Sequence, residues 1–325
     1  MLQRYLYDCL KTIEGSIGII LDDDFRLTFD GTSKISPRLV EQINNLKIAQ
    51  YSGIDVVFGR IAGASPNPPL HGFQGVLFDV LENIKWLKTL DGDAILPNRA
   101  EQNRDNKTKF SEYYYDLTRL HTEHLKTTFW IEPNFEEETV ARAYKRFVKS
   151  IPRILVGENQ TRMIETQVRQ KCWFPSVNRG GITFILNKKA LANTPNLGPR
   201  YKDVFPRRSD MIWSIINRDT LGLTMMQSDI SFFHQGEIFV QEEDILNSFS
   251  FNEIKVQAEL LGSSLYNAMR ESTKHYEILE NTILHLQNRE KQLKESVGVI
   301  GQLANQILEV TVDKNVHRTM EHILS

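Results

Sequence analysis

The sequence predicts an α/β fold, a mixed sheet flanked by helices, followed by a C-terminal helical extension. The apolar run 16–21 is rich in β-branched residues and is typical of a buried strand. A helix-like segment, 36–51, separates it from a second strand-like run, 54–61, so we expect the two strands to form a parallel pair. From residue 251 onward the apolar residues alternate steps of three and four, which indicates long packed helices.

The composition fits a soluble globular protein with one large domain or two smaller ones. The chain has 325 residues, of which 41% are hydrophobic and 25% are charged. The formal charge of −2 provides no global field for nucleic acid, so any anion site must be local. Cys9 and Cys172 have no metal-binding or redox spacing, and no apolar run is long enough to span a bilayer. We therefore expect a cytoplasmic protein without a membrane span.

Periodic apolar residues predict helices around the first two strands. Ser36 and Pro37 have the character of an N-cap and a first-turn proline. The polar stretch 90–109 is predicted to be a long connection. Pro152 is predicted to stop the helix that covers residues 136–148. The helices expected in this part of the chain cover residues 2–14, 36–51, 76–87 and 136–148.

The second half of the predicted sheet domain carries several polar motifs. Gly180 and Gly181 open the strand-like run 182–186, and a double glycine admits close approach of the backbone. The segment 207–210, Arg-Arg-Ser-Asp, stands where a helix is expected to begin, and the helix dipole favours an acid there. His234 follows a strand-like run at its exit.

The C-terminal part is expected to be helical throughout, so the predicted domains are 1–248 and 249–325. Its lysines and arginines are interspersed with acids, which argues against a role at a membrane surface. A helical hairpin that covers the sheet domain and a dimerisation arm both fit the pattern, and the latter would give a homo-oligomer. The apolar positions that carry the heptad pattern are Leu265, Met269, Tyr276, Leu279, Ile283, Leu286, Leu293, Val297 and Ile300.

The aspartate run, Asp22, Asp23 and Asp24, is the strongest functional signal in the sequence. Open α/β sheets place ligands beyond the carboxyl ends of their strands, where this run stands. Three adjacent like charges repel one another, so a fold that gathers them normally offsets the repulsion with a cation or with Arg and Lys. A site for a metal and phosphates is one interpretation, and a solvated acidic turn is the other.

Taken in chain order, the aspartate run, the double glycine, the segment 207–210 and His234 resemble the core of GT-A fold glycosyltransferases. The resemblance covers residues 16–235 and implies a Rossmann-like sheet. In that family a DxD element holds a divalent cation on the diphosphate of a sugar nucleotide. Asp22 and Asp24 match the outer positions of DxD, Asp210 matches the acceptor-side acid, and His234 matches a late histidine on the metal.

The resemblance implies a site for Mn²⁺ or Mg²⁺ with Asp22, Asp24 and His234 as metal ligands. Asp24 is the preferred ligand, whereas Asp22 is expected to contact the ribose or a metal-bound water, with Asp23 on the opposite face of the extended segment. Gly180 and Gly181 would then belong to the segment that contacts the substrates.

On the acceptor side, the resemblance implies that Asp210 is the general base of an inverting reaction. Arg207 and Arg208 would either keep Asp210 ionised or bind phosphate directly. A surface salt-bridge pair is the structural alternative for the two arginines. The implied partners are a sugar-nucleotide donor and an acceptor with a free hydroxyl group.

The chain also departs from the family pattern. Glycosyltransferases of this fold carry nucleotide-binding strands and helices before DxD, whereas one helix and one strand precede Asp22 here. We therefore expect an N-terminally incomplete domain, or a nucleotide pocket drawn from residues 59–74. A metal-dependent nucleotidyl or phosphoryl transferase and a non-catalytic scaffold that binds through its helical tail remain as alternatives.

Overall fold

The computed structural model describes residues 2–20, 25–26, 40, 44, 53–63, 71–109, 126–155, 162, 174–177, 184–193, 206–234 and 253–325. The chain divides into two compact units. Unit 1 comprises residues 1–63, 165–235 and 252–289, and unit 2 comprises residues 64–164, 236–251 and 290–325. The predicted boundary between residues 248 and 249 lies outside the described residues.

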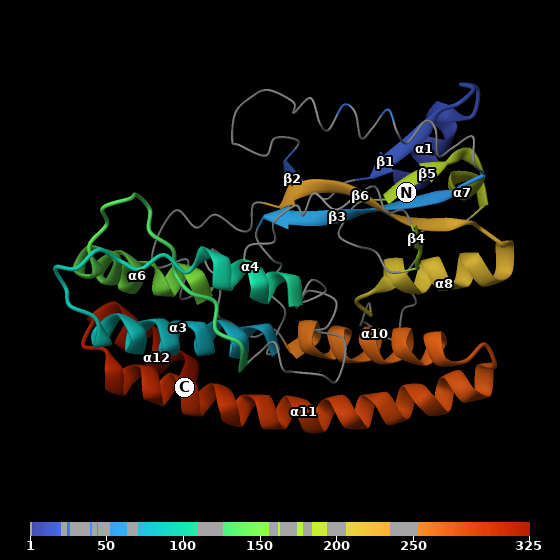
Figure 1. Cartoon of the computed structure of the whole chain (residues 1–325). Helices are drawn as coiled ribbons and strands as arrows, with labels where there is room; N and C mark the ends of the chain where they lie inside the picture. Colours follow the sequence, from blue (N-terminus) through green and yellow to red (C-terminus); the bar gives the residue numbers. More distant parts are fainter. Residues whose placement is uncertain are drawn as a thin grey trace. The chain divides into compact units, whose positions relative to one another are not determined.

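A six-stranded mixed sheet forms the centre of unit 1 (Figure 1). The strands lie in the order β1-β5-β3-β6-β2, and β4 pairs with β6. Their bounds are Ile17–Ile20 for β1, Phe25–Arg26 for β2, Val56–Gly63 for β3, Phe174–Pro175 for β4, Phe184–Asn187 for β5 and Met225–His234 for β6. The general prediction of an α/β fold with a mixed sheet is confirmed.

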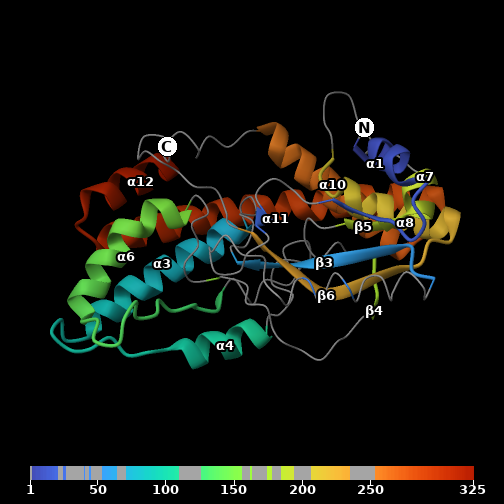
Figure 2. The same ribbon diagram turned by 90° about the horizontal axis from the view of Figure 1, so that it is seen from above.

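The directions of the strands correct one detail of the sequence analysis. β3 and β6 are parallel and run side by side (Figures 1 and 2), whereas β5 pairs antiparallel with both β1 and β3. β1 and β3 therefore point in the same direction, but they are not neighbours, and the prediction of a parallel β1–β3 pair is wrong. A strand that follows more than a hundred residues later in the chain has inserted between them, which local spacing cannot reveal.

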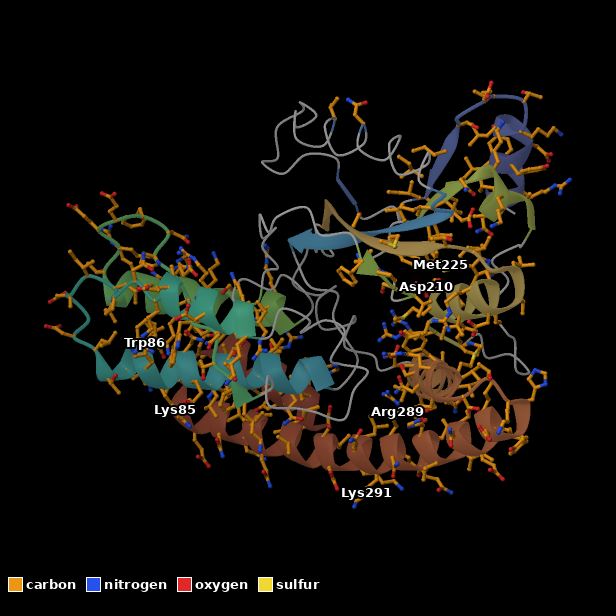
Figure 3. The ribbon with its side chains drawn as sticks, turned by 45° about the vertical axis from the view of Figure 1, so that its right-hand side comes forward. Lys85, Trp86, Asp210, Met225, Arg289 and Lys291 are labelled. Carbon is orange, nitrogen blue, oxygen red and sulfur yellow. The ribbon has the colours of Figure 1, made fainter. Side chains whose placement is uncertain are left out.

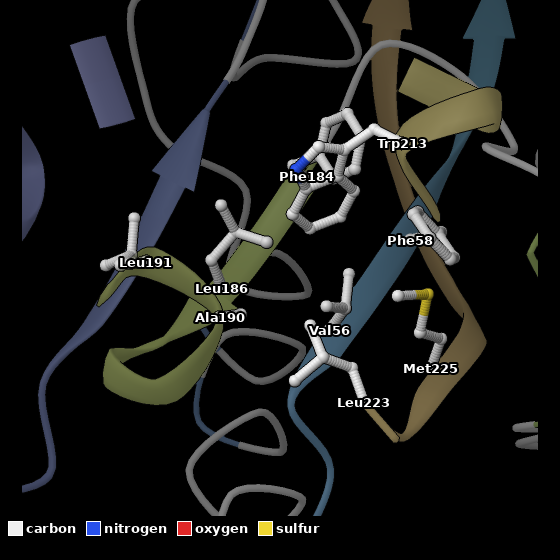
Figure 4. Close-up of a cluster of buried hydrophobic side chains, with 9 residues drawn as sticks. All are labelled: Val56, Phe58, Phe184, Leu186, Ala190, Leu191, Trp213, Leu223 and Met225. Carbon is white, nitrogen blue, oxygen red and sulfur yellow. The ribbon is translucent and has the colours of Figure 1, made fainter. Parts of the chain in front are cut away.

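Large apolar side chains from β3, β5, β6 and two helices form the core of unit 1 (Figure 4). The two helices are α7, Lys188–Asn193, and α8, Ser209–Leu221. The Phe184 ring lies at the centre, 5.5 Å from the ring of Phe58 and 5.5 Å from that of Trp213, both in edge-on geometry. The buried members of this core are Val56, Phe58, Phe184, Leu186, Ala190, Leu191, Trp213, Leu223 and Met225.

Further helices cover this core. α1, Leu2–Leu10, contributes Leu6 and Leu10, as its predicted amphipathic pattern requires. On the other surface of α8, Met211, Ile212 and Ile215 pack against Tyr266 of α10, which spans Glu253–Glu271. α8 therefore contacts the sheet through one face and α10 through another.

Unit 2 is helical in its described part. α6, Val140–Leu155, packs against α3, His71–Thr89, and against α12, Lys314–Leu324. The prediction that Pro152 stops α6 is wrong, because the helix continues to Leu155. Ile151 and Ile154 are buried on either side of the proline, so packing offsets the hydrogen bond that proline cannot donate.

The polar stretch 90–109 is not only a connection, since its second half forms α4, Ala100–Lys109. Side-chain amides, rather than an apolar face, hold this helix in place. Asn103 is buried, and its side chain donates to the carbonyl oxygen of Trp130 and accepts from the Trp130 N–H, both at 2.8 Å. The sequence pattern missed α4 because periodicity detects apolar faces only.

The C-terminal part is helical, as predicted, and consists of α10, α11 and α12. α11 spans His275–Val310 and contains 36 residues. Tyr276, Leu279 and Ile283 of α11 are at least half exposed, whereas Leu303 and Ile307 further along are buried. A homo-oligomer through the C-terminal helices stays a prediction. Among the described residues, no helix has the length and apolar character needed to cross a membrane.

Candidate functional site

The predicted site residues divide into two groups. Asp22, Asp23, Asp24, Gly180 and Gly181 lie outside the described residues. The backbone of His234 is described, and so are Arg207, Arg208 and Asp210 with their side chains. Described strands adjoin the residues of the first group, and residues 206–221 carry the arginines and Asp210 of the second.

The strand that follows the aspartate run pairs with the strand that ends in His234. Phe25, the residue directly after Asp24 in the chain, is the register partner of His234 in the antiparallel β2–β6 pair. On the other side of β6, His234 is the register partner of Gly63, the last residue of β3. His234 thus lies where the parallel strands β3 and β6 both end, which is the edge at which α/β sheets bind ligands.

The strand that precedes the aspartate run adjoins the strand that follows the double glycine. Ile20, the last residue of β1, is the register partner of Phe184, the first residue of β5. The two motif segments are far apart in the sequence, and antiparallel pairing brings the strands beside them together. Sequence reasoning gave the order of the motifs but not this pairing.

Asp210 lies in the first turn of α8, as predicted (Figure 3). The residue before the helix, Arg208, has left-handed backbone angles, with φ 67° and ψ 17°. A non-glycine residue in this region is uncommon, so neighbouring contacts must hold it there. The main-chain carbonyl of Asp210 accepts a hydrogen bond from the Ser214 hydroxyl at 2.8 Å.

Both arginines of the predicted phosphate-binding pair contact Glu259 of α10. Arg208 Nη2 donates to Glu259 Oε1 at 2.9 Å, and Arg207 Nε lies 3.4 Å from Glu259 Oε2. The arginines therefore form salt bridges, as in the structural alternative, but Arg208 is mostly buried rather than on the surface. Sequence reasoning missed Glu259, because no local spacing connects it to residues 51 positions away.

The backbone of Arg207 lies directly on α10. Its N–H donates to the carbonyl oxygen of Ala258 at 2.9 Å. Gly262, one turn further along α10, leaves room for the Arg207 main chain. The start of α8 is thus anchored through its main chain as well as through its side chains.

Acidic and basic side chains lie close together where the start of α8 contacts α10. Burial raises the pKa of Glu259, but Arg208, the Ser263 hydroxyl and Arg207 outweigh that effect and hold the pKa below its usual value. Burial lowers the pKa of Arg289 on α11 to about 10, against the attraction of Glu259 and together with the repulsion of Arg208. In Figure 3, nitrogen-bearing side chains gather between the labelled Asp210 and Arg289.

Another buried carboxylate, Asp55, lies just before β3. It accepts hydrogen bonds at 2.9 Å from the Asn187 amide, from Lys189 Nζ and from the Thr224 N–H. Burial raises its pKa, but these three donors outweigh burial and the pKa is below its ordinary value. Asp55 therefore ties together the ends of β3, β5 and β6, and its donors explain its charge without a ligand.

Within the described ranges, no three His, Cys, Asp or Glu side chains come together in a way that could hold an ion. The aspartates of the predicted metal site are not among the residues covered by that observation.

Comparison of the chain with family models, curated proteins and solved structures finds no match. The evidence for a function of this protein therefore comes from the motifs in the sequence and from the geometry of the described residues.

Proposed function

We propose that this protein is a metal-dependent glycosyltransferase that moves a sugar from a nucleotide-diphosphate donor to an acceptor hydroxyl. One observation carries the proposal. The strand that directly follows the aspartate run pairs with β6, and the partner of its first residue, Phe25, is His234. Two motifs that are about 210 residues apart in the sequence, and that a DxD–histidine metal site needs together, therefore adjoin neighbouring strands.

The proposed donor set suits a hard divalent cation. Asp22 and Asp24 would supply carboxylate oxygens and His234 an imidazole nitrogen, which is a set that Mn²⁺ and Mg²⁺ accept. When bound, such a cation neutralises the charge that develops on the nucleoside diphosphate as it leaves. Gly180 and Gly181 would line the donor site from the segment before β5, and Asp23 would lie on the opposite face of its segment from the metal ligands.

Asp210 is the proposed general base. It is the acidic residue in the first turn of α8, so the start of this helix fixes the position of its carboxylate. Arg207 and Arg208 fix the position of this turn through Glu259, so their first contribution is to orient Asp210. Loss of a positioned general base typically reduces turnover about 10²–10⁴-fold.

The binding test is a thermal-shift screen of nucleoside diphosphates, sugar nucleotides and nucleoside triphosphates, each with Mn²⁺ and with EDTA. We expect Mn²⁺-dependent stabilisation of the wild type by a sugar nucleotide, and its loss in Asp24→Asn and His234→Ala. Asp219→Asn is the matched control, because Asp219 is an exposed acid of α8 that pairs with Arg218. It should respond as the wild type does.

The catalytic test is the release of nucleoside diphosphate from the sugar nucleotide that stabilises the protein. Asp210→Asn should keep Mn²⁺-dependent binding and lose turnover. Absence of metal-dependent stabilisation by every nucleotide would exclude the proposed function. Stabilisation by nucleoside triphosphates alone would instead favour a nucleotidyl or phosphoryl transferase with the same ligands.

A further inference from the structure

We propose that a groove between α6 and the start of α12 binds an acidic protein segment that carries an apolar anchor side chain. The groove belongs to unit 2, in which α6 and α12 pack against each other (Figure 2). Its volume is about 500 Å³, within the range of about 300–1,000 Å³ that is usual for binding pockets. The proposal does not depend on the glycosyltransferase proposal, since Asp210 and His234 belong to unit 1.

The walls of the groove combine apolar and basic side chains. Tyr144, Lys145 and Val148 of α6 line one side, and residues 312–315 line the other. Val148 is buried and Tyr144 is half-buried, whereas Lys145 and Lys314 are exposed. An occupant would therefore meet apolar surface and two cations together.

The side of α6 that carries Lys145 is basic along its length. Arg142, Lys145 and Lys149 are exposed, and their spacing of three and four residues places them on one face of the helix. α6 contains no acidic residue. Arg146 of the same helix contacts Glu138 at 2.8 Å, but in the part of the chain that the structure describes none of the other three forms an ion pair. This face is thus available to attract a negatively charged partner.

The start of α12 adds to the positive charge. Lys314 is the first residue of the helix, and Arg318, one turn further along, is also exposed. Asp313 is the acid in the lining, and its carboxylate accepts from the N–H groups of Asn315 at 3.0 Å and Val316 at 3.2 Å. Asp313 therefore caps the helix, whose dipole stabilises its charge, and the exposed cations remain to attract a partner.

Val312 provides an apolar contact at the edge of the groove. It lies between the end of α11 and the start of α12, and its exposed fraction is 92%. An apolar side chain that covered Val312 and entered the groove beside Val148 would remove apolar surface from water, which is favourable. The proposed partner therefore has an apolar anchor as well as acidic residues.

The lining favours an acidic protein segment over other polyanions. Proteins that bind single-stranded nucleic acid stack the bases on aromatic side chains, whereas Tyr144, the aromatic residue of the lining, is half-buried. Binding to a membrane surface uses a broad apolar face. Among the described lining residues, Val312 is the apolar residue that is exposed, which suits one anchor side chain.

The experiment measures the fluorescence anisotropy of a labelled nine-residue peptide, one leucine between two blocks of four aspartates, as the full chain is added. In the double variant Lys145→Gln/Lys314→Gln, we expect the affinity to fall about tenfold, because each exposed charge contributes about threefold. Lys291→Gln/Lys294→Gln is the matched control, since both are exposed lysines of α11 in unit 2. It should bind the peptide as the wild type does.

Val312→Ser tests the anchor. We expect its affinity for the peptide to fall at least about threefold, because the apolar contact is lost. Replacing the leucine of the peptide by serine should cause a similar loss with the wild type, but little further loss with Val312→Ser. Independent, additive losses would show that the leucine does not contact Val312 and would contradict the proposed mode of binding.

The remaining outcomes are also decisive. Absence of peptide binding by the wild type, or equal affinities in the two double variants, would overturn the proposal. Tighter binding of a single-stranded oligonucleotide with eight phosphates, or of phosphatidylserine vesicles, would also overturn it, because the groove would then serve another class of partner. The substituted side chains are exposed, so every variant should keep the melting temperature of the wild type.

Discussion

Gly262 of α10 lies directly against the main chain of Arg207. A Cβ atom on Gly262 would come within 1.8 Å of the Arg207 carbonyl oxygen and within 2.8 Å of the Arg207 nitrogen. The obstacle is backbone, which cannot turn aside as a flexible side chain can. The absence of a side chain at residue 262 therefore determines how closely the start of α8, with Asp210 in its first turn, approaches α10.

Gly262→Ala is expected to destabilise the protein by about 3 kcal/mol, the upper end of the usual cost of overpacking, because one of two backbones must move. Gly298→Ala is the control. Gly298 belongs to α11, and no heavy atom lies within 4 Å of its added Cβ. This control should be neutral or stabilising by up to about 1 kcal/mol, since alanine favours helices. Thermal unfolding measures both, and equal effects would contradict the close contact.

Asp55→Asn tests the buried carboxylate before β3. We expect a loss of about 1–3 kcal/mol at pH 7, because the amide cannot accept from Lys189, the Thr224 N–H and the Asn187 amide as the carboxylate does. The pKa of Asp55 is lower in the folded protein than in the unfolded chain, so its contribution is complete above about pH 4. It is lost as pH falls through the lower folded value.

The measurement for Asp55 is urea unfolding of the wild type and the variant between pH 7 and pH 3. The difference in the free energy of unfolding should shrink as pH falls. Asp219→Asn removes an exposed acid that pairs with Arg218 and should change stability by less than about 1 kcal/mol. A difference for Asp55→Asn that is constant over the whole pH range would contradict the role of its charge.

Asp79→Asn tests the buried ion pair of unit 2. Asp79 Oδ1 accepts from Arg162 Nη2 at 2.9 Å and from the Phe129 N–H at 3.0 Å, and both charged side chains are 1% exposed. Loss of one charge leaves the other buried, which typically costs about 3–5 kcal/mol. Glu82→Gln, in an exposed pair with Lys85 on the same helix, should cost less than about 1 kcal/mol. Similar melting temperatures for the two variants would refute this difference.

Several features of the fold followed from local sequence patterns. β1 and β3 were predicted from short β-branched runs, and the start of α8 from the position of an acid before an apolar helical pattern. The helical character of the C-terminal part followed from steps of three and four between apolar residues. These patterns succeed because each depends on residues within one or two turns, or within one strand.

Features that depend on polar contacts over long distances were missed. α4 is held by hydrogen bonds between the side-chain amide of Asn103 and the main chain of Trp130, 27 residues away. It has no apolar stripe from which it could have been predicted. Arg207 and Arg208 were predicted beside Asp210, and the structure shows that both also pair with Glu259 of α10. For the candidate site, sequence therefore supplied the residue types and their order, while the partner of the arginines came from the fold.

By itself, the sequence determined the apolar segments that form β1, β3 and the C-terminal helices, because backbone preference and side-chain periodicity are local properties. Only the tertiary structure decided that β5 separates β1 from β3, that Phe25 pairs with His234, and that Arg207 and Arg208 both pair with Glu259. Each of these is a choice of partner between segments far apart in the chain. The pairing of distant segments depends on burial and hydrogen bonding in the folded core, and the sequence of a single segment does not specify it.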